Sequence, residues 1–443
     1  MGNFTFTATG DSIITRRVSQ RKDPAFLEML QLIRSVDAAF TNLELMTPQA
    51  PFVPSSEYGG MHLSAPPFVL DELQWCGFNL YHIAHNHATD YMYQGLVDTI
   101  DQLRLRNMVY AGGGRNLGEA RSPGYLETAA GRVALIGAAS SYVTGALAAE
   151  SRTDVGGRPG ISPLRYATEF VLDAERMAAL ADIDKALGTA AVTARNRVFG
   201  IRPEEQPDAY HFLGRQFVEG KEPAVRTKPK QRDLEEIAHW IAEARRQADF
   251  VVASLHCHEG QNTDGNSAEP ADFIIETAHR WIDAGADAFI GHGPHMLRGI
   301  EIYKGKPIFY SLGNFMFMFE TVQRFPSEMY EAQKLPPTAT PTDVADAWSQ
   351  HENGTAKGFH ADTAFWQSVL PICKFEGGKL AALELHPITL GLARPRTERG
   401  EPTLAGSEEG TAILDRLAQL SAPFGTRLTV EKAGNRVMGR VTL

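Results

Sequence analysis

Apolar runs of strand length alternate with amphipathic segments of helix length along this chain. An apolar run of about four to eight residues bounded by turn residues is typical of a buried strand, and apolar residues that recur about every three to four positions are typical of a surface helix. The strand-like runs lie at residues 4–10, 38–43, 79–84, 133–139, 250–256 and 288–291, with hairpin-like strands at 379–390 and 427–441. The helix-like segments lie at residues 23–36, 95–106, 233–248 and 274–284. This alternation predicts a layered α/β fold.

Side chains that can bind metals follow five of these strand-like runs. The clearest case ends at Gly291, where the backbone can turn sharply and present His292 and His295 from the next loop. Open α/β sheets bind ligands at the carboxyl ends of their strands, so we expect these side chains to meet in one site. The other strand ends carry Asp11; Asn42 and Glu44; His85, Asn86, His87 and Asp90; and His256, His258 and Glu259.

This set combines imidazole nitrogens with carboxylate and amide oxygens. Such ligands suit a divalent cation (Mn, Zn, Fe, Mg or Ca) better than an ion bound by thiolates. Each histidine taken singly could equally be a core or surface residue, but five strand ends with the same chemistry favour a shared site. The sequence therefore predicts a metal site or an acid–base site at these strand ends.

The order of these motifs resembles that of the CapA-like capsule-synthesis (poly-γ-glutamate) family, a branch of the calcineurin-like metallophosphoesterase fold. The matching pieces run across residues 1–318 and are Gly10-Asp11, Asn42-Leu-Glu44, Asn86-His87 with Asp90 and Gly95, His256, Gly291-His292 with Pro294-His295, and Tyr310 to Phe315. The resemblance implies a four-layer α/β/β/α sandwich with insertions. Residues 1–443 are then one metallophosphoesterase-like domain, with insertions near 150–232 and 318–362 and with C-terminal strands in 366–443 that complete the second sheet.

The chain departs from the family patterns at three places. Ile13 stands where the general phosphoesterase pattern has a histidine, and Gly293 stands where the capsule family usually has another one. Residues 256–260 read His-Cys-His-Glu-Gly where that family usually has a His-Trp-Gly motif. Carried over position by position, the resemblance implies a single divalent ion held by Glu44, Asn86, His256 and His292. It leaves Asp11 and His295 for proton transfer.

Within the family, the chain most resembles the lasso-peptide epimerases, which invert a residue of a ribosomally made precursor peptide at Cα, from L to D. The resemblance implies a metal-dependent peptide epimerase in which Asp11 and His295 flank the substrate Cα and handle its proton from opposite faces. The main alternative is a metal-dependent hydrolase of a phosphoester or of a γ-glutamyl or other amide bond, with His87 protonating the leaving group. The third is a non-catalytic binding module. Further contacts in the site are expected from Asn42, His85, Asp90, His258 and Glu259.

Composition narrows the choice of partners and compartment. The net charge of −10 gives no support to nucleic-acid binding. Three cysteines without a close-spaced pair argue against a disulfide framework. The first predicted strand begins by Asn3, which leaves no room for a signal peptide, and no apolar run approaches membrane-spanning length. We therefore expect a cytoplasmic protein that binds a precursor peptide, not nucleic acid or a membrane; the oligomeric state stays open.

Two segments are expected to lie outside the regular α/β pattern. Residues 150–232 resemble an insertion with an Ala-rich helix at 168–190 and a partly basic stretch at 195–232, which we interpret as a solvated surface in preference to a docking site for an acidic peptide or phosphate. The apolar residues 315–319 follow directly after a site motif, and a Pro-rich stretch follows them. We expect both to border the site and to accept a large hydrophobic side chain.

Overall fold

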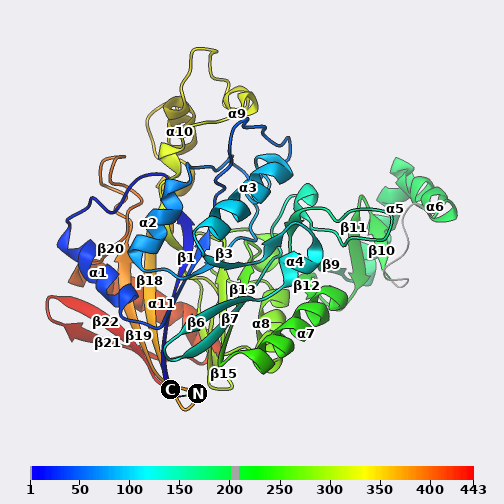
Figure 1. The fold of residues 1–443 in the computed structure, drawn as a ribbon. Helices are drawn as coiled ribbons and strands as arrows, with labels where there is room; N and C mark the ends of the chain where they lie inside the picture. The colour runs from blue at the N-terminus through cyan, green and yellow to red at the C-terminus, as the bar shows by residue number, and fades with distance from the viewer. Residues whose placement is uncertain (1, 201–208) are drawn as a thin grey trace.

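Two large β-sheets face each other in the computed structural model, which describes residues 2–200 and 209–443 (Figure 1). The larger sheet has the order β21-β22-β19-β18-β1-β2-β3-β4, with β17 also paired to β1 and β20 to β19. Its strands are β1 (Asn3–Ile13), β2 (Ala38–Leu43), β3 (Leu80–His82), β4 (Val109–Ala111), β17 (Asn314–Phe317), β18 (Gln367–Glu376), β19 (Lys379–Thr389), β20 (Thr403–Leu404), β21 (Leu428–Ala433) and β22 (Arg436–Val441). The predicted α/β class is confirmed.

The smaller of these two sheets has six strands in the order β15-β16-β14-β13-β7-β6. They are β6 (Gly124–Thr128), β7 (Gly131–Ala139), β13 (Phe250–His256), β14 (Ala288–His292), β15 (Ile300–Tyr303) and β16 (Lys306–Phe309). β7, β13, β14 and β16 run parallel, as do β1 to β4 in the larger sheet. Parallel strands end at the same edge of a sheet, so the polar residues that follow them are brought together.

One hydrophobic cluster fills the space between the two sheets. The ring of Phe250 on β13 lies 4.6 Å from that of Phe4 and 5.4 Å from that of Phe6, both on β1. Burying one such side chain contributes about 1.5–3 kcal/mol to the free energy of folding. The helix α11 (Ser407–Ser421) packs into the same cluster through Leu414 and neighbouring apolar residues.

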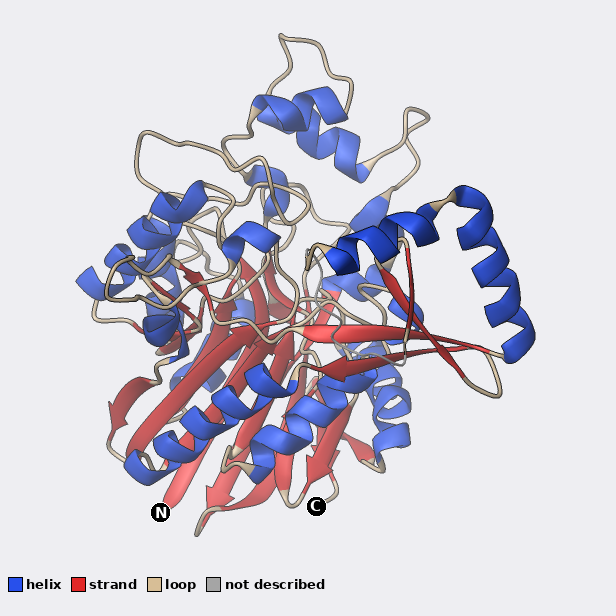
Figure 2. Cartoon of the chain, turned by 90° about the vertical axis from the view of Figure 1, so that its right-hand side faces the viewer, coloured by secondary structure: helices blue, strands red, loops and turns tan. Residues whose placement is uncertain are grey.

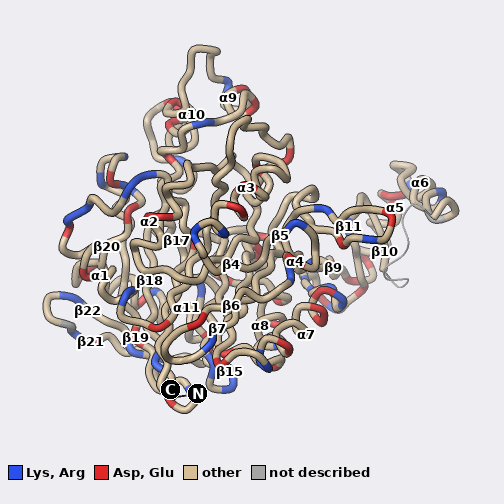
Figure 3. The backbone as a smooth tube through the Cα atoms, in the orientation of Figure 1, with Lys and Arg blue, Asp and Glu red and all other residues tan. Residues whose placement is uncertain are grey.

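Helices cover the outer faces of both sheets, each over a hydrophobic cluster of its own (Figure 1). They are α1 (Pro24–Arg34), α2 (Phe68–Cys76) and α3 (Met92–Leu105) on the larger sheet, and α7 (Gln231–Gln247) and α8 (Asp272–Asp283) on the six-stranded one. Four of them match predicted helices to within a few residues. The start of α1 follows from its sequence, because the Asp23 side chain accepts from the backbone N–H of Phe26 and Pro24 fits the first turn. Acidic and basic residues are mixed along α7 and α8, as in the pair of Arg280 with Glu235 (Figure 3).

The insertion at 150–232 builds a separate four-stranded sheet that projects from the rest of the chain (Figure 2). Its elements are β9 (Tyr166–Leu172), α5 (Ala174–Leu187), α6 (Thr189–Val198), β10 (Tyr210–Phe212), β11 (Arg215–Glu219) and β12 (Ala224–Pro229). The predicted helix over 168–190 is wrong at its start, because 166–172 is the strand β9, paired on both sides. The helix begins only after Asp173, whose side chain caps it. Residues 201–208 of the predicted basic stretch lie outside the described residues.

The C-terminal segment extends the sheet that holds the first strand. β18 runs antiparallel to β1, and β19 and β22 continue outward from it. The segment between 318 and 362 holds two short helices, α9 (Ser327–Ala332) and α10 (Pro341–Ser349). All three cysteines are buried and unpaired, and burial raises the pKa of the Cys257 thiol to about 12. Among the residues described, none of the helices has both the length and the apolar character needed to span a membrane.

Candidate functional site

The predicted site residues converge at the carboxyl ends of β1, β2, β13 and β14. In the parallel ladders, Asp11 stands opposite Asn42, and His256 stands opposite His292. Gly10 is required by a close approach, because a Cβ there would collide with the carbonyl oxygen of Gly313. That carbonyl accepts from the backbone N–H of Asp11 at 3.0 Å, which fixes the strand end beside the site.

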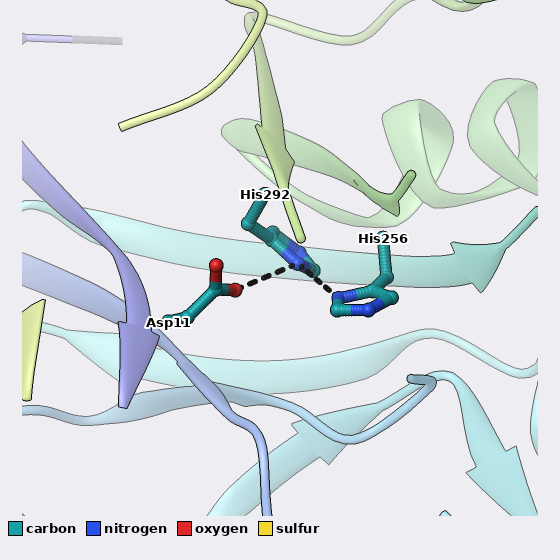
Figure 4. A group of neighbouring side chains, drawn as sticks. All are labelled: Asp11, His256 and His292. Carbon is teal, nitrogen blue, oxygen red and sulfur yellow. Dashed lines mark hydrogen bonds and ion pairs between the residues drawn. The ribbon is translucent and has the colours of Figure 1, made fainter. Parts of the chain in front are cut away.

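Three buried side chains form the centre of the site (Figure 4). The Nδ1 atoms of His256 and His292 lie 3.1 Å apart, and an Asp11 oxygen lies 3.7 Å from the same His292 nitrogen. On its other side, His292 Nε2 lies 2.8 Å from the hydroxyl oxygen of Ser254. Burial lowers the pKa of both imidazoles well below the usual value. Neutral imidazoles whose nitrogens face one another and a carboxylate are suited to hold a cation.

Glu44 gives the clearest sign that this site suits a cation. It is fully buried, and neither of its carboxylate oxygens has a hydrogen-bond partner. One oxygen lies 3.7 Å from His256 Nε2 and 3.8 Å from His295 Nε2. Burial raises the pKa of Glu44 well above its usual value, and the nearby charge of Asp11 adds to the effect. A buried carboxylate without donors is costly unless a cation neutralises it, so the donor set fits a divalent metal ion.

Two more side chains close the site around His256. Its Nε2 lies 2.9 Å from Asn86 Oδ1 and 3.1 Å from His258 Nε2. The Asn86 amide donates its N–H to the carbonyl of Gly59 at 3.0 Å, which aims its oxygen at His256. His258 is oriented from behind, since its Nδ1 donates to Asn266 Oδ1 at 2.6 Å.

The predicted ligands are thus brought together, but with additional groups among them. The possible ligands form two sets, and within each set the ligand atoms lie within 4.8 Å of one another. The first set is Asp11, His256 and His292, and the second is Glu44, His258 and His295. The sequence analysis missed Ser254, Asn266 and Asn314, which orient the histidines. Ser254 lies inside the predicted strand 250–256, where it reads as an ordinary inward residue, and Asn266 carries no local motif. Asn314 lies inside the Tyr310-to-Phe315 motif but was not singled out as a site residue.

Two histidines of the site are each paired with a buried aspartate. His87 Nδ1 lies 2.8 Å from Asp90 Oδ2, and His295 Nδ1 lies 3.3 Å from Asp11 Oδ2 and 2.9 Å from Asn314 Oδ1. The side chains of Asp11 and His295, which were expected to flank a substrate carbon, thus contact each other in the structure.

Asp11 is held as an anion inside the protein. It accepts from the backbone N–H of Gly293 at 3.0 Å and from the Asn42 amide at 2.8 Å. Burial by itself raises the pKa of Asp11, but the hydrogen bond and charge of His295, together with the charge of His292, bring it below its ordinary range. Gly293 has a φ of +114°, and a Cβ there would lie 3.2 Å from His258 and from His256. The left-handed backbone and the close histidine rings therefore favour glycine at the position whose N–H donates to Asp11.

A cavity of about 490 Å³ opens beside these groups. Asn86, His87, His258 and His295 line it, together with Ile13. Its apolar wall consists of Tyr58, Met61, Leu63, Tyr142, Val143, Phe317, Phe319, Trp348 and Phe359. Of residues 315–319, Phe317 and Phe319 border the cavity as expected, whereas Phe315 lies in the core beside Phe78. Trp348 and Phe359 show that the 318–362 segment also borders the cavity.

Two of the predicted contacts lie behind the site. Glu259 accepts from the Ser140 hydroxyl at 2.8 Å and belongs to neither ligand set. His85 is buried, with its ring 6.1 Å from that of His256, and burial lowers its pKa well below the usual value. A further histidine that sequence analysis missed, His82, is fully buried with its ring 4.4 Å from that of His292. These two imidazoles support the ligand histidines by packing.

Comparisons with known proteins match most of the chain. The family model described as bacterial capsule synthesis protein PGA_cap covers residues 5–318. The Sinorhizobium fredii protein named uncharacterized protein y4sH is 35% identical over 441 residues, which cover 97% of this chain and 91% of that protein. Capsule biosynthesis protein CapA of Bacillus anthracis is 25% identical over 71% of this chain and 59% of its own length. PGA biosynthesis protein CapA of Bacillus subtilis is 27% identical over 58% and 47%.

Proposed function

The chain belongs to the bacterial capsule synthesis protein PGA_cap family, and from this premise we propose that it is a metal-dependent peptide epimerase. It would invert a Cα centre, from L to D, in a ribosomally made precursor peptide of lasso-peptide biosynthesis. The layer order that we infer for it, with helices, two facing sheets and helices, is that of the calcineurin-like metallophosphoesterase fold.

The observation that carries this proposal is the pair of histidines on one cavity. His87 and His295 both line it, and each is backed by a buried aspartate, Asp90 and Asp11. Inversion at Cα requires one group that removes the proton and another that returns a proton on the opposite face. Two imidazoles supply both roles, because each can be a base when neutral and an acid when protonated. In this proposal His87 and His295 are the two groups that handle the proton, and Asp11 acts through its contact with His295.

The aspartates determine which nitrogen of each imidazole we assign to the reaction. His87 uses Nδ1 toward Asp90, and His295 uses Nδ1 toward Asp11 and Asn314, so we assign Nε2 of each ring to the substrate. Nε2 of His295 lies 3.8 Å from a Glu44 oxygen, at the edge of the proposed metal site. When one Nε2 takes the Cα proton, the C–H electron pair passes toward the neighbouring carbonyl. The protonated imidazole is stabilised by its aspartate. The other ring returns a proton to Cα, so the peptide gains and loses no atoms.

The metal ion would be held by Glu44, Asn86, His256 and His292, with His258 as an additional ligand. The unpartnered Glu44 carboxylate and the facing imidazole nitrogens fit such an ion. When bound, the ion would polarise the substrate carbonyl and so make the neighbouring Cα proton more acidic.

The cavity wall favours a bulky apolar side chain on the target residue. Among the described residues that line the cavity there is no lysine or arginine, which would be expected for a phosphoester or a polyanionic chain. Burying one aromatic side chain against this wall supplies about 1.5–3 kcal/mol of binding.

The second candidate is a metal-dependent hydrolase of a phosphoester or an amide bond. The observation that favours it is the His87–Asp90 pair beside Asn86, since an imidazolium there can protonate a leaving group. In that case His87 is required and His295 is not.

Incubation of the protein with linear peptides in deuterated water separates the two reactions. Epimerisation adds about one dalton without changing the chain length, because solvent hydrogen enters at Cα. Hydrolysis instead adds the mass of water or gives fragments. We expect His87→Ala and His295→Ala both to stop inversion. The matched control is His279→Ala, because His279 is a half-buried histidine paired with Glu301 at 3.0 Å that neither lines the cavity nor belongs to either ligand set. An active His295→Ala together with an inactive His87→Ala would support the hydrolase.

A further inference from the structure

Two further hollows, of about 380 and 370 Å³, border the same chain segments as the catalytic cavity. Residues 48–67 contribute to the walls of all three, and residues 317–330 do so as well. The two smaller hollows share Phe52 and Arg324, so they lie on either side of these side chains. The hollows therefore follow the seam between the two segments.

A row of aromatic contacts joins the catalytic cavity to these hollows. Tyr58 lines the cavity, and its ring lies 4.4 Å from that of His62. The ring of His62 lies 6.0 Å from that of Tyr91, which in turn lies 6.4 Å from that of Phe52. An extended peptide rises ~3.3 Å per residue, so each step of this row corresponds to about one to two residues of a bound chain.

Hydrogen bonds connect the same row to Asp90, the partner of His87. His62 Nε2 lies 2.9 Å from the carbonyl oxygen of Ser55, and the backbone N–H of Ser55 donates to the carbonyl of Asp90 at 2.8 Å. The Asp90 carboxylate also accepts from the backbone N–H of Leu63 at 2.8 Å. A peptide that contacts this segment is thereby held at a fixed distance from His87.

Arg324 is the charged group of this seam. Its guanidinium lies 4.4 Å from the centre of the Phe52 ring, and the side chain is exposed. No aspartate or glutamate of the described chain lies within ion-pair distance of it, and no other charged residue is found among the described residues that line the two hollows. The remaining walls are mainly proline and aromatic, with amide side chains such as Gln49 and Gln323. Such walls suit an extended peptide, whose backbone groups pair with the amides.

We propose that the two hollows bind the part of the substrate peptide next to the target residue, and that Arg324 pairs there with a carboxylate side chain of that peptide. This assignment rests on the proposed action on a linear peptide. It makes an acidic residue at one fixed spacing from the target a determinant of specificity. The cation stacked on Phe52 is already positioned, so it loses little freedom when the carboxylate arrives.

The test uses fluorescently labelled peptides of about twelve residues, long enough at ~3.3 Å per residue to cross the cavity and both hollows. Each peptide has one phenylalanine in a Ser/Ala background and a single glutamate at a different distance from it, on either side. A second set carries glutamine at the same places. Binding is measured by fluorescence anisotropy, which requires no turnover. We expect one spacing at which the glutamate peptide binds about twofold to fivefold more tightly than the glutamine peptide. This difference in affinity should become smaller at high salt.

Three variants decide whether Arg324 is the cause. In Arg324→Gln the preference for glutamate should disappear, and in Arg324→Glu a peptide with lysine at the same position should bind better than one with glutamate. Arg34→Gln is the matched control, because Arg34 also stacks on an exposed aromatic ring, that of Trp75 at 4.7 Å, away from the seam. Equal binding of glutamate and glutamine at every spacing, or a preference that survives Arg324→Gln, would overturn the proposal. Failure of the proposed function would show itself separately, as the absence of deuterium uptake by peptides that do bind.

Discussion

Replacing Glu44 by glutamine should stabilise the metal-free protein and destabilise the metal-loaded one relative to wild type. Glu44 is fully buried, and both of its carboxylate oxygens lack donors. Without a cation, its negative charge destabilises the folded state. With a cation, the same charge is a ligand. Glu44→Gln removes the charge and keeps the shape.

The size of the effect follows from burial. An unpaired charge buried in protein costs several kcal/mol, part of which is avoided when the group takes up a proton, so we expect a gain of about 1–3 kcal/mol in the metal-free variant. Because burial raises the pKa of Glu44, the gain should be absent below the usual pKa of 4.5 and grow as the pH rises above it. A metal at about 100 times its Kd stabilises the wild type by ~2.7 kcal/mol, and the variant should lose most of this.

Urea unfolding with a chelator and with added divalent metal measures both free energies, and titration calorimetry measures the metal affinity. Glu72→Gln is the matched control. Glu72 is also buried, but its carboxylate accepts from the backbone N–H groups of Val18 and Ser19 at 2.9 and 2.7 Å. Its replacement should destabilise the protein equally in both conditions. If Glu44→Gln behaved like Glu72→Gln, the carboxylate would have a structural role and the metal assignment would be wrong.

Three further predictions concern the groups around the site. Ser254→Ala removes the partner of His292 Nε2 and should weaken metal binding about tenfold in calorimetry while the fold is kept, and an unchanged affinity would contradict the orienting role. Asp90→Asn should lower the rate of deuterium uptake at Cα at least about tenfold, because His87 loses the group that stabilises its protonated form, whereas metal content should stay the same. Phe359→Ala enlarges the cavity, so a peptide with a bulky target residue should lose about 1–2 kcal/mol of binding free energy, seen as a higher KM, while kcat and metal content change little. A loss of folding would assign this residue to the core.

Sequence alone identified most of the chemistry of the site. Each motif is local, since a strand period followed by glycine, histidine or carboxylate can be recognised within about ten residues. The edge of a parallel sheet then brings such motifs together whatever the details of packing. For that reason Glu44, Asn86, His256 and His292 could be grouped in advance, and the helices α1, α3, α7 and α8 could be placed to within a few residues.

Only the tertiary structure decided which neighbour each side chain faces. Asp11 and Gly293 are 282 positions apart in sequence, yet the backbone N–H of Gly293 donates to the Asp11 carboxylate. This contact, with that of His295, gives Asp11 an imidazole as its neighbour. The pairing depends on how the two sheets pack across their common core, to which distant strands contribute. The same is true of β18, whose place beside β1 is fixed by ladder hydrogen bonds between residues more than three hundred positions apart, and no local pattern encodes such a partner.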